Sequence, residues 1–242
     1  MKYLLSSCII LFLLIACSKE NSTPTNDQNN DNGQNNNPQL TYVPDDNFEQ
    51  ALIDLGYDDV LDDYVLTSNI SSVTDLFIDA LNILDLTGIE DFVALTDLSC
   101  DFNQLTTLDV SQNTVLDVLS LNGNQLTSLD VSQNTALTYL NCRNNKLTSL
   151  DVSQNVALVH LSCQDNQLTS LDVSQNTALT ILQCEFNNLT ALDVSNGNNA
   201  NFEAMNALDN NLTCIQIDEG FTPPTDGSWQ KDPNTIYSTN CN

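Results

Sequence analysis

The string Leu-Asp-Val-Ser occurs five times at intervals of 21 residues, and no other feature constrains the fold of this chain as strongly. The copies begin at Leu108, Leu129, Leu150, Leu171 and Leu192. A chain that repeats one short unit stacks its units, because each unit buries its apolar edge only against its neighbours. The repeat therefore predicts a solenoid rather than a globule with one central core.

A second phrase lies between the copies of the first. It reads Leu140-Asn-Cys-Arg-Asn-Asn-Lys-Leu147 in one turn and Leu161-Ser-Cys-Gln-Asp-Asn-Gln-Leu168 in the next. This phrase resembles the leucine-rich-repeat family, and the resemblance extends over residues 70–217. Both halves of each turn follow the pattern Leu-x-x-Leu-x-apolar-x-x-Asn, which predicts short parallel strands on two opposite walls with bends at the asparagines.

We therefore expect a mostly-β leucine-rich-repeat solenoid of about seven turns over residues 70–217. Residues 41–69 are expected to form a small helical cap, since Asp45 or Asp46 can cap a helix with Phe48, Leu52 and Leu55 on one face. A looped cap is expected at residues 218–242, where proline and glycine are frequent.

The N-terminal residues are typical of an exported and tethered protein. An apolar run ends at Ala16 and is too short to span a bilayer comfortably, which predicts a signal peptide over residues 1–16. The sequence Leu14-Ile15-Ala16-Cys17 resembles the lipobox of bacterial lipoproteins, which implies lipidation of Cys17; an unmodified cysteine near a plain cleavage site is the alternative. Residues 17–40 are Asn-rich and predict a flexible linker.

The chain is strongly acidic, with 32 Asp and Glu against five Lys and Arg and a formal net charge of -27. We expect no nucleic-acid binding, because phosphate contacts need clustered basic side chains. Contact with a membrane is expected only through the N-terminal lipid, since bare anionic lipid would repel this charge.

The cysteines fall into two groups. Cys100, Cys142, Cys163 and Cys184 occupy an apolar slot of the repeat, so we expect buried, reduced thiols; a soft-metal site is the alternative, although metal ligands normally converge from several directions. Cys214 and Cys241 lie outside that slot and bracket the C-terminal segment. An exported chain permits a disulfide between these two.

A row of aspartates repeats once per turn. Neighbouring carboxylates near 5 Å repel by roughly 1 kcal/mol even in water, so hydration, hydrogen bonds or cations must offset them. We favour a hydrated row, with no cofactor, over weak calcium binding. The row comprises Asp109, Asp130, Asp151, Asp172 and Asp193, and the acidic stretch Asp58, Asp59, Asp62 and Asp63 in the cap is a similar candidate.

One wall of the predicted solenoid varies from turn to turn, whereas the other repeats Asp and Ser. Exposed aromatic and aliphatic side chains in a row are typical of interaction surfaces, although drift on an unused face would also produce variation. The candidate ligand-binding residues on this wall are Val118, Tyr139, Asn141, Arg143, His160, Gln164, Ile181 and Gln183.

The repeats are similar to those of internalin-like bacterial adhesins and to the short 21-residue repeats of Bacteroidota surface proteins. This resemblance implies a non-catalytic envelope protein that recognises a protein or glycan, anchored at the outer membrane on the periplasmic face or the cell surface. A structural envelope protein without a ligand is the first alternative. An envelope hydrolase is the second, and it would need a specific carboxylate or His160, the single histidine.

Overall fold

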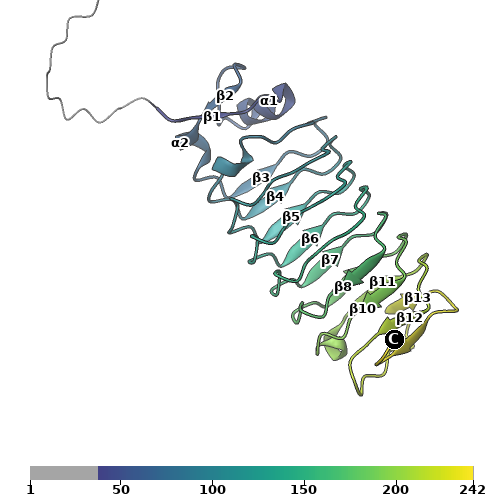
Figure 1. Cartoon of the computed structure of the whole chain (residues 1–242). Helices are drawn as coiled ribbons and strands as arrows, with labels where there is room; N and C mark the ends of the chain where they lie inside the picture. The colour runs from purple at the N-terminus through teal and green to yellow at the C-terminus, as the bar shows by residue number, and fades with distance from the viewer. Residues whose placement is uncertain (1–37, 242) are drawn as a thin grey trace, which may run out of the picture. The chain divides into compact units, whose positions relative to one another are not determined.

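The computed structural model describes residues 38–241, which form a stack of short turns around a continuous apolar core (Figure 1). The predicted signal peptide, the lipidation candidate Cys17 and the linker up to residue 37 lie outside the described residues. Within the described part of the chain, no helix is long and apolar enough to cross a membrane.

The N-terminal cap combines a small antiparallel sheet with two short helices. Strand β1 (Leu40–Tyr42) pairs with β2 (Tyr64–Leu66), α1 (Asp46–Asp54) lies between them in sequence, and α2 (Thr67–Ile70) follows. This arrangement agrees with the expected helical cap and adds a strand pair to it.

Asp45 joins this cap to the solenoid. Its Oδ1 accepts hydrogen bonds from the backbone N–H groups of Asn47 and Phe48, each at 3.0 Å, and so caps α1. Its Oδ2 accepts from the N–H groups of Leu84 at 2.7 Å and Asp85 at 3.0 Å in the first solenoid turn. The structure therefore selects Asp45 over Asp46, because only Asp45 serves both elements.

The predicted apolar face of the helix is only partly correct. Phe48 and Leu52 are fully buried in the core, as expected. Leu55, which was expected on the same face, is 48% exposed. Leu55 is the residue at which the helix ends, so its side chain lies beyond the part of the helix that packs on the core.

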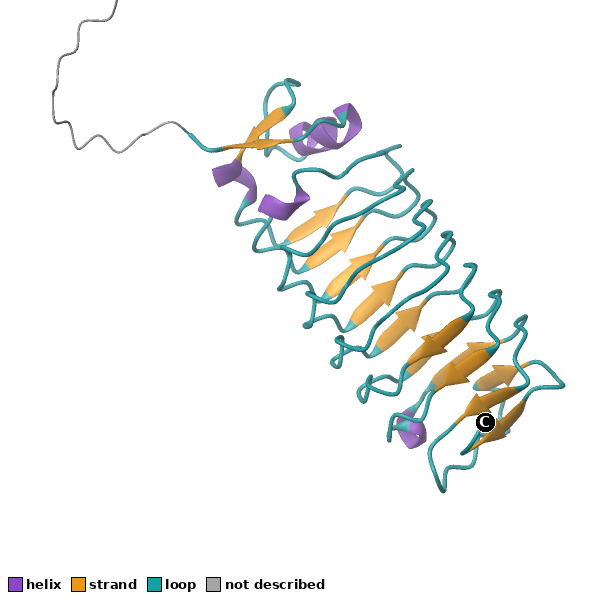
Figure 2. Cartoon of the chain, viewed as in Figure 1, coloured by secondary structure: helices purple, strands orange, loops and turns teal. Residues whose placement is uncertain are grey.

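Within residues 38–241, eight parallel strands form one long sheet, with one strand in each turn (Figure 2). The solenoid therefore has about eight turns, one more than expected. In each of the first six strands the central residue is buried and its neighbours point the other way, which is the alternation of a β-strand. In the last two strands the buried residues in register are Met205 and Trp229. The strands, in order, are β3 (Asp75–Phe77), β4 (Asp97–Ser99), β5 (Val118–Ser120), β6 (Tyr139–Asn141), β7 (His160–Ser162), β9 (Ile181–Gln183), β11 (Ala204–Ala207) and β13 (Trp229–Lys231).

The opposite wall forms a sheet only in the last turns, which corrects the expectation of strands on both walls throughout. This four-stranded parallel sheet comprises β8 (Ser170–Asp172), β10 (Ala191–Asp193), β12 (Cys214–Gln216) and β14 (Ile236–Ser238). The same Leu-Asp-Val string at residues 108–110, 129–131 and 150–152 forms no strand in the described structure. A ladder on this wall requires neighbouring turns to approach within hydrogen-bond distance on both walls at once, and the local sequence does not decide that spacing.

The C-terminal segment is more regular than the expected looped cap. Strand β13 pairs in parallel with β11, and β14 pairs in parallel with β12, so both sheets continue beyond residue 217. Trp229 of β13 is buried against Phe202, Phe221 and Tyr237, with ring centroids 5.5, 5.0 and 5.8 Å away. These aromatic side chains cover the last apolar edge of the stack, which explains why this segment is ordered as strands.

Two short 3-10 helices complete the described elements. They are η1 (Ile89–Asp91) in an early turn and η2 (Asn199–Asn201) in a late turn. Ile89 and Asn199 are buried, so each helix places one side chain into the stack. Both therefore belong to the solenoid and not to the caps.

Asparagine side chains satisfy the backbone at the bends. Asn145 is representative: its Oδ1 accepts from the N–H of Leu126 at 3.0 Å, and its Nδ2 donates to the carbonyls of Leu121 at 2.9 Å and Cys142 at 3.1 Å. Asn145 therefore links its own turn to the preceding one. Equivalent bonds are made by Asn103, Asn124, Asn166, Asn187 and Asn210.

Asn145→Ala should lower the free energy of unfolding by about 1–3 kcal/mol, because it leaves the buried backbone N–H of Leu126 without a partner and removes one of the two amide donors to the Leu121 carbonyl. Urea denaturation of the full chain measures this effect. The exposed Gln154→Ala is the control and should change stability by less than about 0.5 kcal/mol. Equal midpoints for the two variants would contradict the role assigned to the amide.

Candidate functional site

The outward face of the long sheet carries one row of larger side chains. Val118, Tyr139, His160 and Ile181 are the first residues of β5, β6, β7 and β9, and they are direct partners in the strand register. All four are partly exposed. The structure thus brings these four sequence-predicted candidates together; we call them the variable row.

A second row of polar residues runs beside the variable row. Asn141 donates from Nδ2 to the Oγ of Ser120 at 3.0 Å, and Ser162 donates from Oγ to the Oε1 of Gln183 at 2.8 Å. These bonds connect neighbouring turns, so the candidates Asn141 and Gln183 are held in place on the sheet. Their positions are therefore set before any partner arrives.

His160 occupies the centre of this surface. Its ring centroid lies 4.8 Å from that of Tyr139, and its Nε2 lies 2.9 Å from the Oγ of Ser162. Burial lowers the pKa of His160 below its ordinary value, although the hydrogen bond with Gln183 opposes this shift. The imidazole is therefore held mainly neutral near pH 7.

The contact between Ser162 and His160 was not anticipated from the sequence, although alternate residues of a strand share a face. Ser162 donates its hydroxyl proton to Gln183, so it can only accept from the imidazole, and Nε2 must carry the hydrogen. The side chain of Ser162 is 3% exposed. A serine that gives its proton to an amide, beside a histidine that acts as donor, is not arranged as an activated nucleophile.

A third row of side chains lies just beyond the ends of the strands. One of the predicted ligand-binding candidates in this row is not exposed. Arg143 is exposed, but Gln164 is only 5% exposed and its Oε1 has no hydrogen-bond partner. Gln164 is therefore not available as the exposed contact that the sequence predicted. Burial also raises the pKa of Glu185 in the next turn, and the Arg143 charge opposes that shift.

The aspartate row on the opposite wall is built from local turns. In each copy, Oδ1 of the aspartate accepts the N–H of the serine two residues later, as Asp151 does from Ser153 at 2.9 Å. These bonds lower the pKa of Asp109, Asp130 and Asp151. Among residues 38–241, no three acidic, histidine or cysteine side chains lie where they could hold a metal ion together. The weak calcium candidates of this row, Asp172 and Asp193 included, gain no support.

The two groups of cysteines differ as the sequence suggested. Cys214 and Cys241 form a disulfide with an S–S distance of 1.99 Å, which confirms that pairing. Cys100, Cys142, Cys163 and Cys184 are free and fully buried. Burial raises the pKa of Cys142 to about 12, so these thiols remain protonated near neutral pH.

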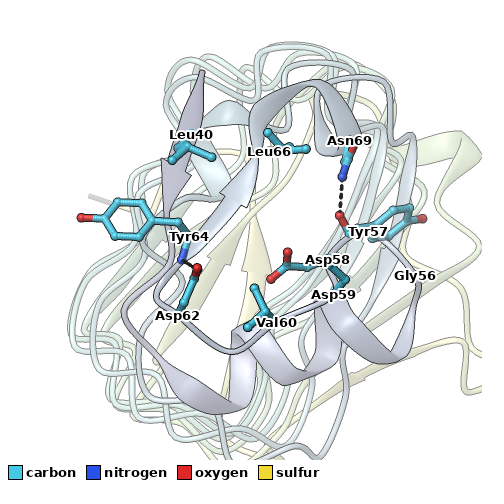
Figure 3. Close-up of a pocket in the computed structure, with 10 residues that line it drawn as sticks. All are labelled: Leu40, Gly56, Tyr57, Asp58, Asp59, Val60, Asp62, Tyr64, Leu66 and Asn69. Carbon is cyan, nitrogen blue, oxygen red and sulfur yellow. Dashed lines mark hydrogen bonds between the residues drawn. The ribbon is translucent and has the colours of Figure 1, made fainter. Parts of the chain in front are cut away.

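A hollow of about 380 Å³ lies in the N-terminal cap, and Asp58 points into it (Figure 3). Burial raises the pKa of Asp58, and the carboxylates of Glu49, Asp59 and Asp62 raise it further against a backbone hydrogen bond. Asn69, which also lines the hollow, donates to the carbonyl of Tyr57 at 2.8 Å (Figure 3). Like the aspartate row, this acidic stretch forms no three-ligand group in the described residues.

Comparison with known proteins finds similarity to leucine-rich-repeat proteins. A model of leucine-rich repeats in two copies matches residues 114–155. Internalin J of Listeria monocytogenes serotype 4b (strain F2365) is 40% identical over 73 residues, which are 30% of this chain and 8% of that protein.

Solved structures show the same similarity over more of the chain. The functional domain of internalin J from Listeria monocytogenes, which includes a cysteine ladder, is 34% identical with a TM-score of 0.68, and the match covers 85% of this chain and 50% of that one. Internalin C2 of Listeria monocytogenes (str. 4b F2365) matches at 18% identity with a TM-score of 0.65, over 81% of this chain and 95% of that one, which shows the fold alone.

The chain spans half or less of the internalin J sequences that it matches. The TM-scores show that the chain shares its fold with these structures. In its repeat and its fold, the chain is similar to internalin-like leucine-rich-repeat proteins.

Proposed function

We propose that the protein is a non-catalytic binding module of the cell envelope, which recognises a protein partner through the outward face of the long sheet. The variable row carries this proposal. Its four residues lie on adjacent strands about 4.8 Å apart, so they form a strip about 15 Å long. Partly exposed aromatic and aliphatic side chains in such a strip are typical of interaction hot spots.

The contrast between the two walls supports this choice of face. The opposite wall repeats Asp and Ser in the same positions, whereas the first residues of β5, β6, β7 and β9 differ in every turn. Recognition of one partner requires a surface that is not self-repeating, because identical turns would offer the same contacts in several registers. The varied wall meets this requirement.

We propose that the protein binds its partner and does not act on it as a catalyst. The single histidine, His160, donates to Ser162, which in turn donates to Gln183. The aspartates on the other wall accept hydrogen bonds within their own local turns. A hydrolase would need a carboxylate or an imidazole free to exchange protons with a substrate. The bonds around His160 make that role unfavourable.

Tyr139→Ala should weaken binding of the partner at least about tenfold, because it removes the largest contact of the variable row. Candidate partners are purified envelope and host surface proteins, and the measurement is the affinity for the immobilised full chain. The control is Val156→Ala, an exposed apolar residue outside both sheets. Equal loss in both variants, or no saturable partner at all, would contradict the proposal.

We further propose that the protein is exported and held at the envelope by a lipid on Cys17. The support is the apolar run before Cys17 and the polar segment after it. In membrane fractionation of the producing cells, Cys17→Ser should move the protein out of the membrane fraction. Retention of this variant in the membrane would argue against the lipid anchor.

A further inference from the structure

The first two turns of the long sheet present a different surface from the variable row. Phe77, the last residue of β3, is 63% exposed on the outward face of the sheet. Asp75 lies two residues before it in the same strand, so alternation places it on the same side. Asp79 lies in the turn after the strand and accepts a hydrogen bond from Ser99, the register partner of Phe77. An aromatic ring is thus displayed between two carboxylates.

The next turn adds a second pair of carboxylates. Asp97 is the direct register partner of Asp75, and Asp101 donates its backbone N–H to the Oδ1 of Asp79 at 2.7 Å. Strands in this sheet are about 4.8 Å apart, so like charges face each other across both pairs. Neighbouring charges at this distance repel each other even at the dielectric constant of water.

Hydroxyl and backbone groups, and no basic side chains, hold these carboxylates. Thr74 donates to Asp75 at 2.6 Å and Thr96 donates to Asp97 at 3.0 Å. Ser99 donates to Asp79 at 2.6 Å. In each case one carboxylate oxygen is held and the other is left for an external donor. Ser120 similarly holds Asp101 at 2.8 Å.

The basic residues of the described chain lie elsewhere. They are Arg143, Lys146 and Lys231, and all three belong to later turns. The carboxylates around Phe77 are therefore not neutralised by a basic side chain of residues 38–241. A partner that brings positive charge would complement them.

We infer that this end of the long sheet binds a basic segment of the protein partner, with a lysine or arginine side chain over Phe77 between the two pairs of aspartates. A cation over an aromatic face is attracted by the ring, and the flanking carboxylates add charge complementarity. The inference rests on the proposed function in taking the outward face of the sheet as the contact face.

An organic cation fits this surface better than a metal ion. The carboxylates lie on both sides of the Phe77 ring and do not converge on one point, and no three-ligand group is present in residues 38–241. A metal ion would gain nothing from the ring, whereas a lysine or arginine side chain gains contact with both the ring and the carboxylates.

The acidic surface around Phe77 is continuous with the variable row, and this continuity defines how the partner lies. Strand β4 pairs with β5, whose first residue Val118 begins the row, and Tyr139 follows in β6. A partner segment that runs along the stack therefore places basic side chains over β3 and β4 and apolar side chains over β5 to β7. The acidic end supplies orientation, and the variable row supplies apolar contact.

Fluorescence anisotropy with a labelled octalysine peptide and the full chain tests this inference. At about 0.15 M salt, charges more than about 8 Å apart are largely screened, so distant carboxylates contribute little. Asp75→Asn with Asp97→Asn should weaken binding about three- to tenfold, and Phe77→Ala about two- to fivefold. The matched control, Asp151→Asn with Asp172→Asn, removes the same charge from the opposite wall and should change the affinity less than about twofold.

Equal weakening by both double variants would overturn the inference, because it would show a response to net charge alone. Absence of saturable octalysine binding, or full affinity in Phe77→Ala, would also overturn it. Tyr139→Ala should leave octalysine affinity unchanged, which separates the two proposals. If Tyr139→Ala loses partner capture but the natural chain does not bind octalysine, this inference fails and the proposed function stands. If the natural chain binds octalysine as expected but Tyr139→Ala keeps full partner capture, the proposed function fails and this inference stands.

Discussion

Leu140→Ala is expected to lower the free energy of unfolding by about 2–5 kcal/mol. Leu140 is the fully buried centre of β6, and it stacks in register between Leu119 and Leu161 of the neighbouring turns. Truncation removes apolar contacts in both directions along the stack and leaves a cavity. The turns on either side cannot close this cavity, because backbone hydrogen bonds set their spacing.

Chemical denaturation of the full chain, followed by circular dichroism, measures this effect. The matched control is Leu84→Ala, which makes the same change at a side chain that is 58% exposed and should shift stability by less than about 0.5 kcal/mol. In a repeat array a central defect can also split the transition in two, since each turn contacts only its neighbours. Similar denaturation midpoints for Leu140→Ala and Leu84→Ala would contradict the buried leucine stack.

Removing the disulfide by Cys214→Ser with Cys241→Ser is expected to cost about 2–5 kcal/mol. The bond closes a loop with a sequence separation of 27, which contains β13 and β14. Without it, these strands lose the covalent link that restricts the unfolded chain. Their detachment would expose Trp229 and the last apolar edge of the core.

Thermal unfolding followed by tryptophan fluorescence detects this loss, because Trp229 is the single tryptophan. Reductant should destabilise the natural chain by a similar amount and leave the double variant unchanged. The four buried thiols are already reduced and do not respond to reductant. A reductant effect of equal size on both proteins would show that the stabilisation comes from elsewhere.

Much of the candidate site could be predicted because a strict repeat converts sequence spacing into position. Residues 21 apart in the central turns occupy equivalent places in neighbouring turns, so Tyr139 and His160 were expected side by side, and their rings are 4.8 Å apart. The disulfide was predictable by a different argument, since Cys214 and Cys241 lie outside the slot of the other cysteines.

Side chains whose exposure depends on neighbouring turns could not be predicted in the same way. Gln164 follows the same pattern as Arg143, yet the first is buried and the second is exposed. Phe77 lies in an early turn with irregular spacing, so the repeat did not identify it as a surface residue. Its alternation with Leu76, which is fully buried, was the available signal.

The repeat by itself determined the class of fold, the stacked leucines and asparagines, and the row of varied side chains, because periodicity acts locally and identically in every turn. The tertiary structure alone decided where the second wall becomes a sheet, how residues 229–231 and 236–238 extend both sheets, and which polar side chains are covered. The physical reason is that these properties depend on the distance between turns. That distance results from packing along the whole stack, so copies with the same local string can differ in structure.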